Sequence, residues 1–163
     1  MPTPTPRAGS STFTVAEDTF INASRASTNY GTDRGVGADN APTVRGLLRF
    51  NVTGIPPGAT ITSARLTVYV RNGSDNTGSL WQVGGSWEEM TTTWDNAPSI
   101  GGFVADLSGA ATVGAWIEAD VTSQILGDGR YDFYLTSSSN DNVVYHSREA
   151  GNNPPTLTVD YTY

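Results

Sequence analysis

Alternating apolar and polar residues mark three segments of the chain as β-strands. In residues 61–71 the apolar side chains share one face: Ala64, Leu66, Val68 and Val70. Residues 44–52 and 156–163 alternate in the same way, which turns Arg45 and Arg49 away from the apolar face. We therefore predict strands with one buried face and one face exposed to water.

Five more short segments have the composition of strands, and turn residues separate them. They are residues 11–16, 79–87, 112–121, 130–138 and 142–149, with breaks such as Asn72-Gly73 and Asp128-Gly129. Residues 120–129 could form one helical turn, which is too short to change the class. Many short strands separated by turn residues predict an all-β, antiparallel β-sandwich.

Composition excludes several kinds of site. The 163 residues contain no cysteine and no lysine, and His146 is the only histidine. Disulfides, thiolate chemistry, Schiff bases and multi-histidine metal sites are therefore ruled out. Adjacent or alternating acids such as Glu88 and Glu89 are ordinary surface charge, so we predict that the protein is not an enzyme.

The length predicts one domain, residues 12–163, after a stiff linker remnant at residues 1–11 that is rich in proline and threonine. A linker of this kind before an acidic, cysteine-free β-domain suggests one monomeric module of a secreted or cell-surface bacterial protein, covalently joined to further domains. No apolar run approaches the roughly 20 residues that span a bilayer, so we expect no membrane partner.

Charge is unevenly distributed along the chain. The net charge is −7, yet residues 1–71 carry seven arginines and four acids, whereas residues 72–163 carry two arginines and twelve acids. An anionic ligand would therefore be held by the first half. A pI near 4.4 opposes the long basic track that nucleic acid requires.

Several motifs together resemble one family. They are AEDTFI, STNYG, RGLLRFNVTGIPPGATITSARLTVYV, GSWEEMTTTWDNAP, ADVT and HSREAGNNPPTLTVDYTY, in that order. The chain from about Thr14 to Tyr163 resembles the DNRLRE domain, or carbohydrate-binding module family 96. The resemblance implies a non-catalytic jelly-roll module attached to a secreted polysaccharide-active enzyme or surface protein, in some cases binding an acidic polysaccharide such as alginate.

The candidate ligand-binding residues are arginines and aromatics. A guanidinium matches the planar carboxylate of a uronate, and aromatic rings stack on sugar rings. The candidates are Arg25, Arg34, Arg45, Arg49, Arg65, Arg71, Tyr30, Tyr69 and Trp87. We assign Trp94 and Trp116 to the core. The alternative is that the arginines only protect strand edges and pair with local acids, in a structural spacer or adhesion module without a glycan site.

A structural calcium ion is a second candidate ligand. Jelly-roll modules commonly hold one, and calcium takes six to eight oxygen ligands. The family-like motifs place Asp18, Asn29 and Glu149 where terminal strands could converge, and we name these three as candidate ligands. The competing interpretation is that Asp18 and Asn29 stabilise turns and that Glu149 pairs with an arginine.

Overall fold

A computed structural model describes all 163 residues and contains eleven strands and three short 3-10 turns. The strands are β1 (Ala8–Thr14), β2 (Glu17–Asn22), β3 (Gly35–Asn40), β4 (Thr43–Val52), β5 (Thr60–Asn72), β6 (Ser79–Val83), β7 (Ile100–Asp106), β8 (Trp116–Asp120), β9 (Gly129–Thr136), β10 (Val143–His146) and β11 (Thr156–Thr162). The turns are η1 (Ala23–Arg25), η2 (Thr122–Gln124) and η3 (Arg148–Ala150). No helix is long and apolar enough to cross a membrane.

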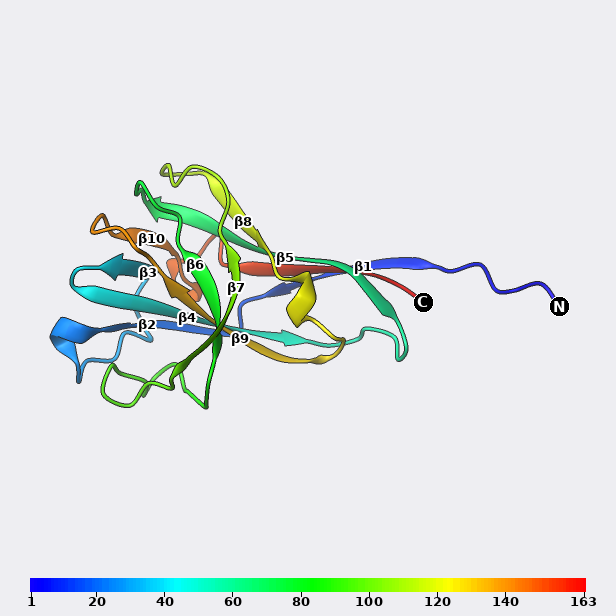
Figure 1. Ribbon diagram of the computed structural model, residues 1–163, viewed down its shortest axis with the longest axis horizontal. Helices are drawn as coiled ribbons and strands as arrows, with labels where there is room; N and C mark the ends of the chain where they lie inside the picture. Colours follow the sequence, from blue (N-terminus) through cyan, green and yellow to red (C-terminus); the bar gives the residue numbers. More distant parts are fainter.

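The strands form one antiparallel sheet that curls into a half-barrel (Figure 1). Its order is β1-β11-β5-β10-β3-β4-β9-β6-β7, with β8 on β5 and β2 on β4. β3 joins the two halves, because it pairs with β10 along Gly35–Ala38 and with β4 at Asp39 and Asn40. The prediction of an all-β, antiparallel fold is confirmed, while the β-sandwich and its jelly-roll type stay predictions.

The alternation along β4 and β5 determines what the sheet encloses. Leu48 and Phe50 of β4 face Leu66 and Val68 of β5 within a main core of 24 buried residues. The opposite face of β4 is covered as well, by the loop of residues 84–99. That second face buries a smaller cluster of four residues: Ile21, Leu47, Trp87 and Tyr134.

The local pattern missed β2, β3 and β7. In β3 the residues that alternate with Val36 and Ala38 are the buried Gly35 and Gly37, so the apolar and polar alternation that marks a strand is missing there. The glycines are needed because a Cβ on Gly37 would lie 2.5 Å from the carbonyl oxygen of Val143 on the neighbouring strand. The short helical turn expected within residues 120–129 is η2.

The two ends of the chain lie side by side at one end of the molecule (Figure 1). β1 pairs with β11 from Ala8 onward, and Arg7 and Tyr163 exchange two backbone hydrogen bonds. The sheet therefore begins four residues before the expected domain start at residue 12. Ladder pairing requires no apolar side chain, which is why the small residues Ala8, Gly9 and Ser10 gave no strand signal.

Candidate functional site

The structure separates the candidate arginines instead of gathering them. Arg49 is buried, although alternation correctly turns it away from the main core. Its Nε and Nη2 donate to the two carboxylate oxygens of Asp132 at 2.8 and 3.1 Å, and its Nη1 pairs with Glu17. Nη2 also donates to the carbonyl oxygen of Trp87 at 3.1 Å. The expectation that Arg49 is exposed is wrong, because the loop of residues 84–99 covers it.

That loop carries two of the four tryptophans, and each lies under an arginine of β4. The Arg49 guanidinium is 4.4 Å from the centre of the Trp87 ring, and the Arg45 guanidinium is 5.2 Å from that of Trp94. Trp87 is buried, so it provides no platform for a ligand, whereas Trp94 is partly buried as expected. Burial lowers the pKa of Arg49, but the neighbouring carboxylates of Asp132 and Glu17 raise it by more, so the net pKa of Arg49 is raised. The positive charge of Arg49 is therefore neutralised by residues of the chain itself.

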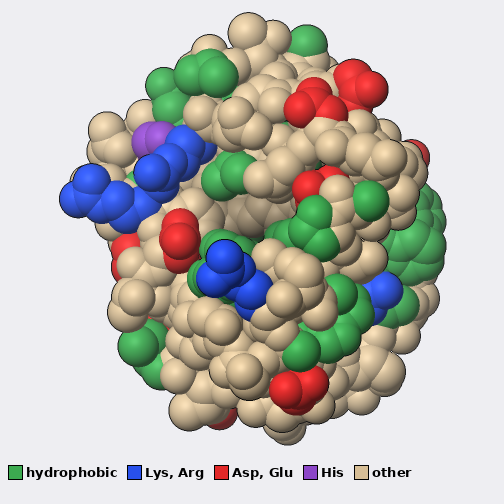
Figure 2. Space-filling view, turned by 90° about the vertical axis from the view of Figure 1, so that its left-hand side faces the viewer, with side chains coloured by type: hydrophobic (Ala, Val, Ile, Leu, Met, Phe, Trp, Pro, Cys, Tyr) green, Lys and Arg blue, Asp and Glu red, His purple; other side chains and the backbone are tan.

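The remaining arginines differ in their partners. Arg65 pairs with Asp160 at 3.3 Å on the outer face of β5 and β11. Arg25, Arg34 and Arg71 are exposed and form no ion pair. Figure 2 shows basic side chains beside the histidine, others below a hollow near the centre of this face, and another at the opposite edge.

A row of aromatic side chains, which we call the platform, crosses the outer face of β8, β5 and β10. It consists of Trp116, Tyr69 and His146. The Tyr69 ring lies 5.1 Å from that of Trp116 and 4.7 Å from that of His146, both edge to face. Arg71 follows Tyr69 on the same face of β5. Arg34 directly precedes Gly35, the residue that pairs with His146, and its backbone carbonyl oxygen accepts from the Ser147 amide at 3.2 Å. Arg71 therefore lies on the face of the platform, and the exposed Arg34 lies near His146 along the backbone.

Trp116 is a correction to the sequence analysis, which assigned it to the core. Its exposure is 50%. The signal was present in the sequence, since Ile117, Ala119 and Val121 are all buried and an alternating strand then turns Trp116 outward. Tyr30, another candidate, is half-buried and stacks on Phe20 with ring centres 4.1 Å apart.

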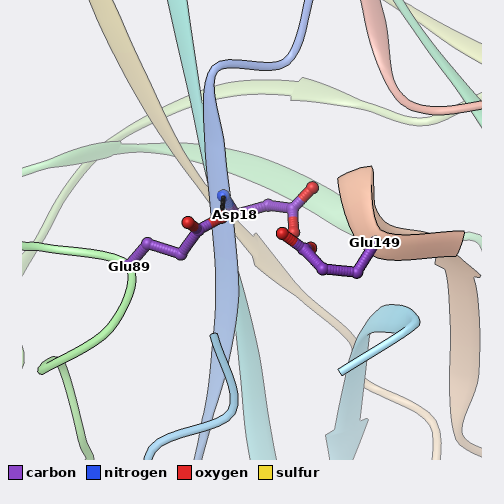
Figure 3. Close-up of side chains that lie close together, drawn as sticks. All are labelled: Asp18, Glu89 and Glu149. Atoms are coloured by element: carbon purple, nitrogen blue, oxygen red, sulfur yellow. Dashed lines mark hydrogen bonds between the residues drawn. The ribbon is translucent and has the colours of Figure 1, made fainter. Parts of the chain in front are cut away.

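Three carboxylates meet on the side of β2 that is opposite to Glu17 and Arg49. We call them the carboxylate cluster: Asp18, Glu89 and Glu149. One oxygen of each lies within 4.8 Å of the others, and Figure 3 shows Asp18 between Glu89 of the loop and Glu149 of η3. The Asp18 amide donates to Glu89 Oε1 at 3.0 Å, and Asp18 Oδ2 accepts from the Arg148 amide at 2.7 Å. Sequence reasoning brought Asp18 and Glu149 together but missed Glu89, which a loop supplies.

The cluster carries more negative charge than its neighbouring cation can neutralise. The only cation within it is Arg148, whose Nη2 pairs with Glu89 and, at 3.0 Å, with Glu149. Burial raises the pKa of Asp18 to about 8; the Arg148 amide opposes this, while the charges of Glu149 and Glu89 add to it. Glu149 Oε2 is buried and has no hydrogen-bond partner. The arrangement therefore favours an added positive charge.

Asn29, the third expected calcium ligand, does not turn its oxygen toward the cluster. Its Oδ1 accepts from the Gly31 amide at 3.0 Å, and its Nδ2 donates to the carbonyl oxygens of Glu89 and Thr92, both at 2.8 Å. Asn29 thus fixes the backbone that carries Glu89. The oxygens that could contact a cation are those of Asp18, Glu89 and Glu149.

The comparisons with known proteins agree with this architecture. The model of carbohydrate-binding module family 96 matches residues 9–161, and no curated protein is significantly similar to the chain. The match covers nearly the whole chain, so the chain belongs to this family of carbohydrate-binding modules.

Proposed function

We propose, taking membership of carbohydrate-binding module family 96 as the premise, that this chain binds an acidic polysaccharide on the platform of Trp116, Tyr69 and His146. The indole face of Trp116 stacks on a sugar ring, while Arg71 and Arg34 pair with uronate carboxylates. Alginate is one polymer of this kind. The observation that carries the proposal is the exposure of the Trp116 ring on the same face of the sheet as Tyr69 and Arg71, an arginine without an ion pair.

The role that follows is that of a non-catalytic accessory module. A jelly-roll domain joined to a secreted bacterial enzyme or surface protein raises the local concentration of that partner at the polymer. Both chain ends lie together at one end of the molecule, so linked domains would leave from that end.

Affinity electrophoresis in alginate, pectin and a neutral glucan, at two salt concentrations, tests this proposal. We expect binding to alginate and pectin that weakens with salt, and roughly tenfold weaker binding for Trp116→Ala and Arg71→Gln. Arg65→Gln is the matched control. It removes the same charge from the same strand as Arg71→Gln, but Arg65 is already paired with Asp160. Absence of binding to any polymer would support the spacer instead, and salt-insensitive binding would remove the arginines from the site.

We also propose that the carboxylate cluster holds a structural calcium ion through Asp18, Glu89 and Glu149. Calcium prefers carboxylate oxygens, and the unpartnered Glu149 Oε2 offers one that is already desolvated. The ion would join β2, the loop of residues 84–99 and η3. Its role would be structural, because it would join three segments that lie far apart in the sequence.

A further inference from the structure

A narrow trough lies beside the platform, between β2 and the β3–β10 pair. Its volume is about 170 Å³, and Phe20 of β2 and Val144 of β10 form its apolar walls. The other residues around it are Asn22, Asp33, Gly35, Gly37, Val44 and Asn142. The trough is therefore part apolar and part polar, as binding sites for sugar rings are.

The glycines of β3 keep the trough open. A Cβ on Gly35 would lie 2.5 Å from Cγ1 of Val144, and one on Gly37 would lie 3.2 Å from its Cγ2. A side chain at Gly37 would clash with the backbone of β10, where the Val143 carbonyl oxygen lies 2.5 Å from the Cβ position, and a side chain at Gly35 would require the Val144 side chain to move. The backbone of β3 consequently lines the trough directly.

The platform and the trough are parts of one surface. Val144 and His146 lie on the same face of β10 and pair with Gly37 and Gly35 of β3. His146 contacts Tyr69 on β5, the strand on the other side of β10. Adjacent strands are about 4.8 Å apart, so the Tyr69 ring and the trough are separated by about 10 Å across two strand spacings. A polymer that crosses the strands would contact both.

The two parts differ in charge. The platform face carries Arg71, whereas the trough is lined by the carboxylate of Asp33 and by side-chain amides. Asp33 Oδ1 accepts from the Gly35 amide at 2.9 Å, which holds the carboxylate at the edge of the trough. Carboxylates and amides hydrogen-bond to hydroxyl groups, and a carboxylate repels a second carboxylate. The trough thus favours a sugar without an acid group.

We propose that the trough is a second subsite for the same glycan and takes a neutral sugar, so that the preferred ligand is a polymer in which uronates alternate with neutral sugars. This inference rests on the proposed function, because the platform supplies the uronate subsite. It narrows the substrate class from acidic polysaccharides in general to heteropolymers with spaced acid groups.

Calorimetry with two sets of oligosaccharides of equal length tests the inference: hyaluronan fragments, which alternate a uronate with a neutral sugar, and alginate fragments, which contain only uronates. We expect tighter binding of the hyaluronan fragments. Asp33→Asn retains the oxygen that accepts from Gly35, and it should strengthen alginate binding roughly threefold while leaving hyaluronan binding unchanged. Asp106→Asn, an exposed acid on β7, is the control for net charge.

The outcomes separate this inference from the proposed function. If Trp116→Ala weakens binding of both sets but Asp33→Asn changes neither, the platform stands and the trough is not a subsite. Equal strengthening of both sets by Asp33→Asn would also overturn the inference, because it would indicate general charge attraction. If no oligosaccharide binds, both proposals fail.

Discussion

The Arg49 environment and the carboxylate cluster are two buried charged regions built from the same segments, and they are balanced differently. Glu17 and Asp18 are successive residues of β2 and point to opposite sides, and the loop of residues 84–99 supplies Trp87 to one region and Glu89 to the other. Arg49 contacts two carboxylates, a carbonyl oxygen and an aromatic ring. The cluster offers one partly exposed guanidinium to three carboxylates.

The unpartnered atoms show what this difference means. Around Arg49 the buried atom without a partner is the neutral Nε1 of Trp87, whereas in the cluster it is a carboxylate oxygen, Glu149 Oε2. A neutral donor without a partner costs far less than an uncompensated charge. The first region is therefore complete within the chain, and the second depends on a proton or a cation from solution.

The largest loss of stability should come from removing Arg49 from its buried ion pairs. Arg49→Met leaves Glu17 and Asp132 without their cation, and removing one partner of a buried ion pair costs about 3–5 kcal/mol of unfolding free energy. Chemical denaturation measures this loss. Arg25→Met, which removes an exposed and unpaired arginine, should stay within about 0.5 kcal/mol. Similar small losses for both variants would show that Arg49 is not the centre of its region.

The cluster should make stability depend on pH when a chelator removes divalent cations. The pKa of Asp18 is about 8 in the folded protein and near 3.8 when unfolded, so the folded state holds the extra proton between these values. Unfolding free energy should therefore fall as pH rises through this window, by up to about 1.4 kcal/mol for each pH unit. Asp18→Asn should remove that dependence, as denaturation across the pH range would reveal. A profile identical in the variant and the parent would place the titration elsewhere.

Calcium should act on the cluster and not on the Arg49 environment. Added calcium should stabilise the protein by about 1 kcal/mol or more once it exceeds its dissociation constant several-fold, and a chelator should reverse the gain. Thermal melts with and without calcium measure it, with Glu149→Gln as the variant that should lose the response and Arg25→Met as one that should keep it. An unchanged melting temperature after chelation would count against a structural ion.

The smallest loss of stability should come from Arg45 of β4, the second arginine that contacts the covering loop. Arg45 lies over Trp94 without any carboxylate partner, and Arg45→Gln should cost about 0.5 kcal/mol, the size of an exposed cation–π contact. Chemical denaturation of both variants, Arg45→Gln and Arg49→Met, would show how much of the difference in their unfolding free energies comes from the carboxylates that contact Arg49. A loss as large as that of Arg49→Met would mean that the ring contacts, and not the ion pairs, stabilise the loop.

The sequence predicted the strands in which apolar and polar residues alternate regularly. It did not predict contacts between residues that are far apart in the chain. β4, β5 and β11 follow from their side-chain pattern, and the same pattern turned Arg49 to the correct face. Nothing local in β4 indicates that residues 84–99 return to cover that face. Glu89 was missed for the same reason, because a loop residue joins Asp18 only through the tertiary fold.

The site shows a different limit. Tyr69, Arg71 and Arg34 were candidates, yet Trp116 was assigned to the core because large aromatics are commonly buried. The alternation of residues 116–121 contained the opposite answer. Many of the motif residues that identified the family, such as Arg49, Trp87 and Glu149, instead stabilise the covering loop and its charges. They reveal the architecture, but they lie outside the proposed platform.

The pairing of β1 with β11 has a mechanical consequence. Residues 7 and 163 are neighbours at the same end of an antiparallel ladder, so tension applied between them would load the backbone hydrogen bonds one after another, like a zipper. Tension between the platform and either end would instead load many strands at once. A module anchored on its ligand should therefore resist a pull toward one flanking domain far better than a pull that separates its own two ends.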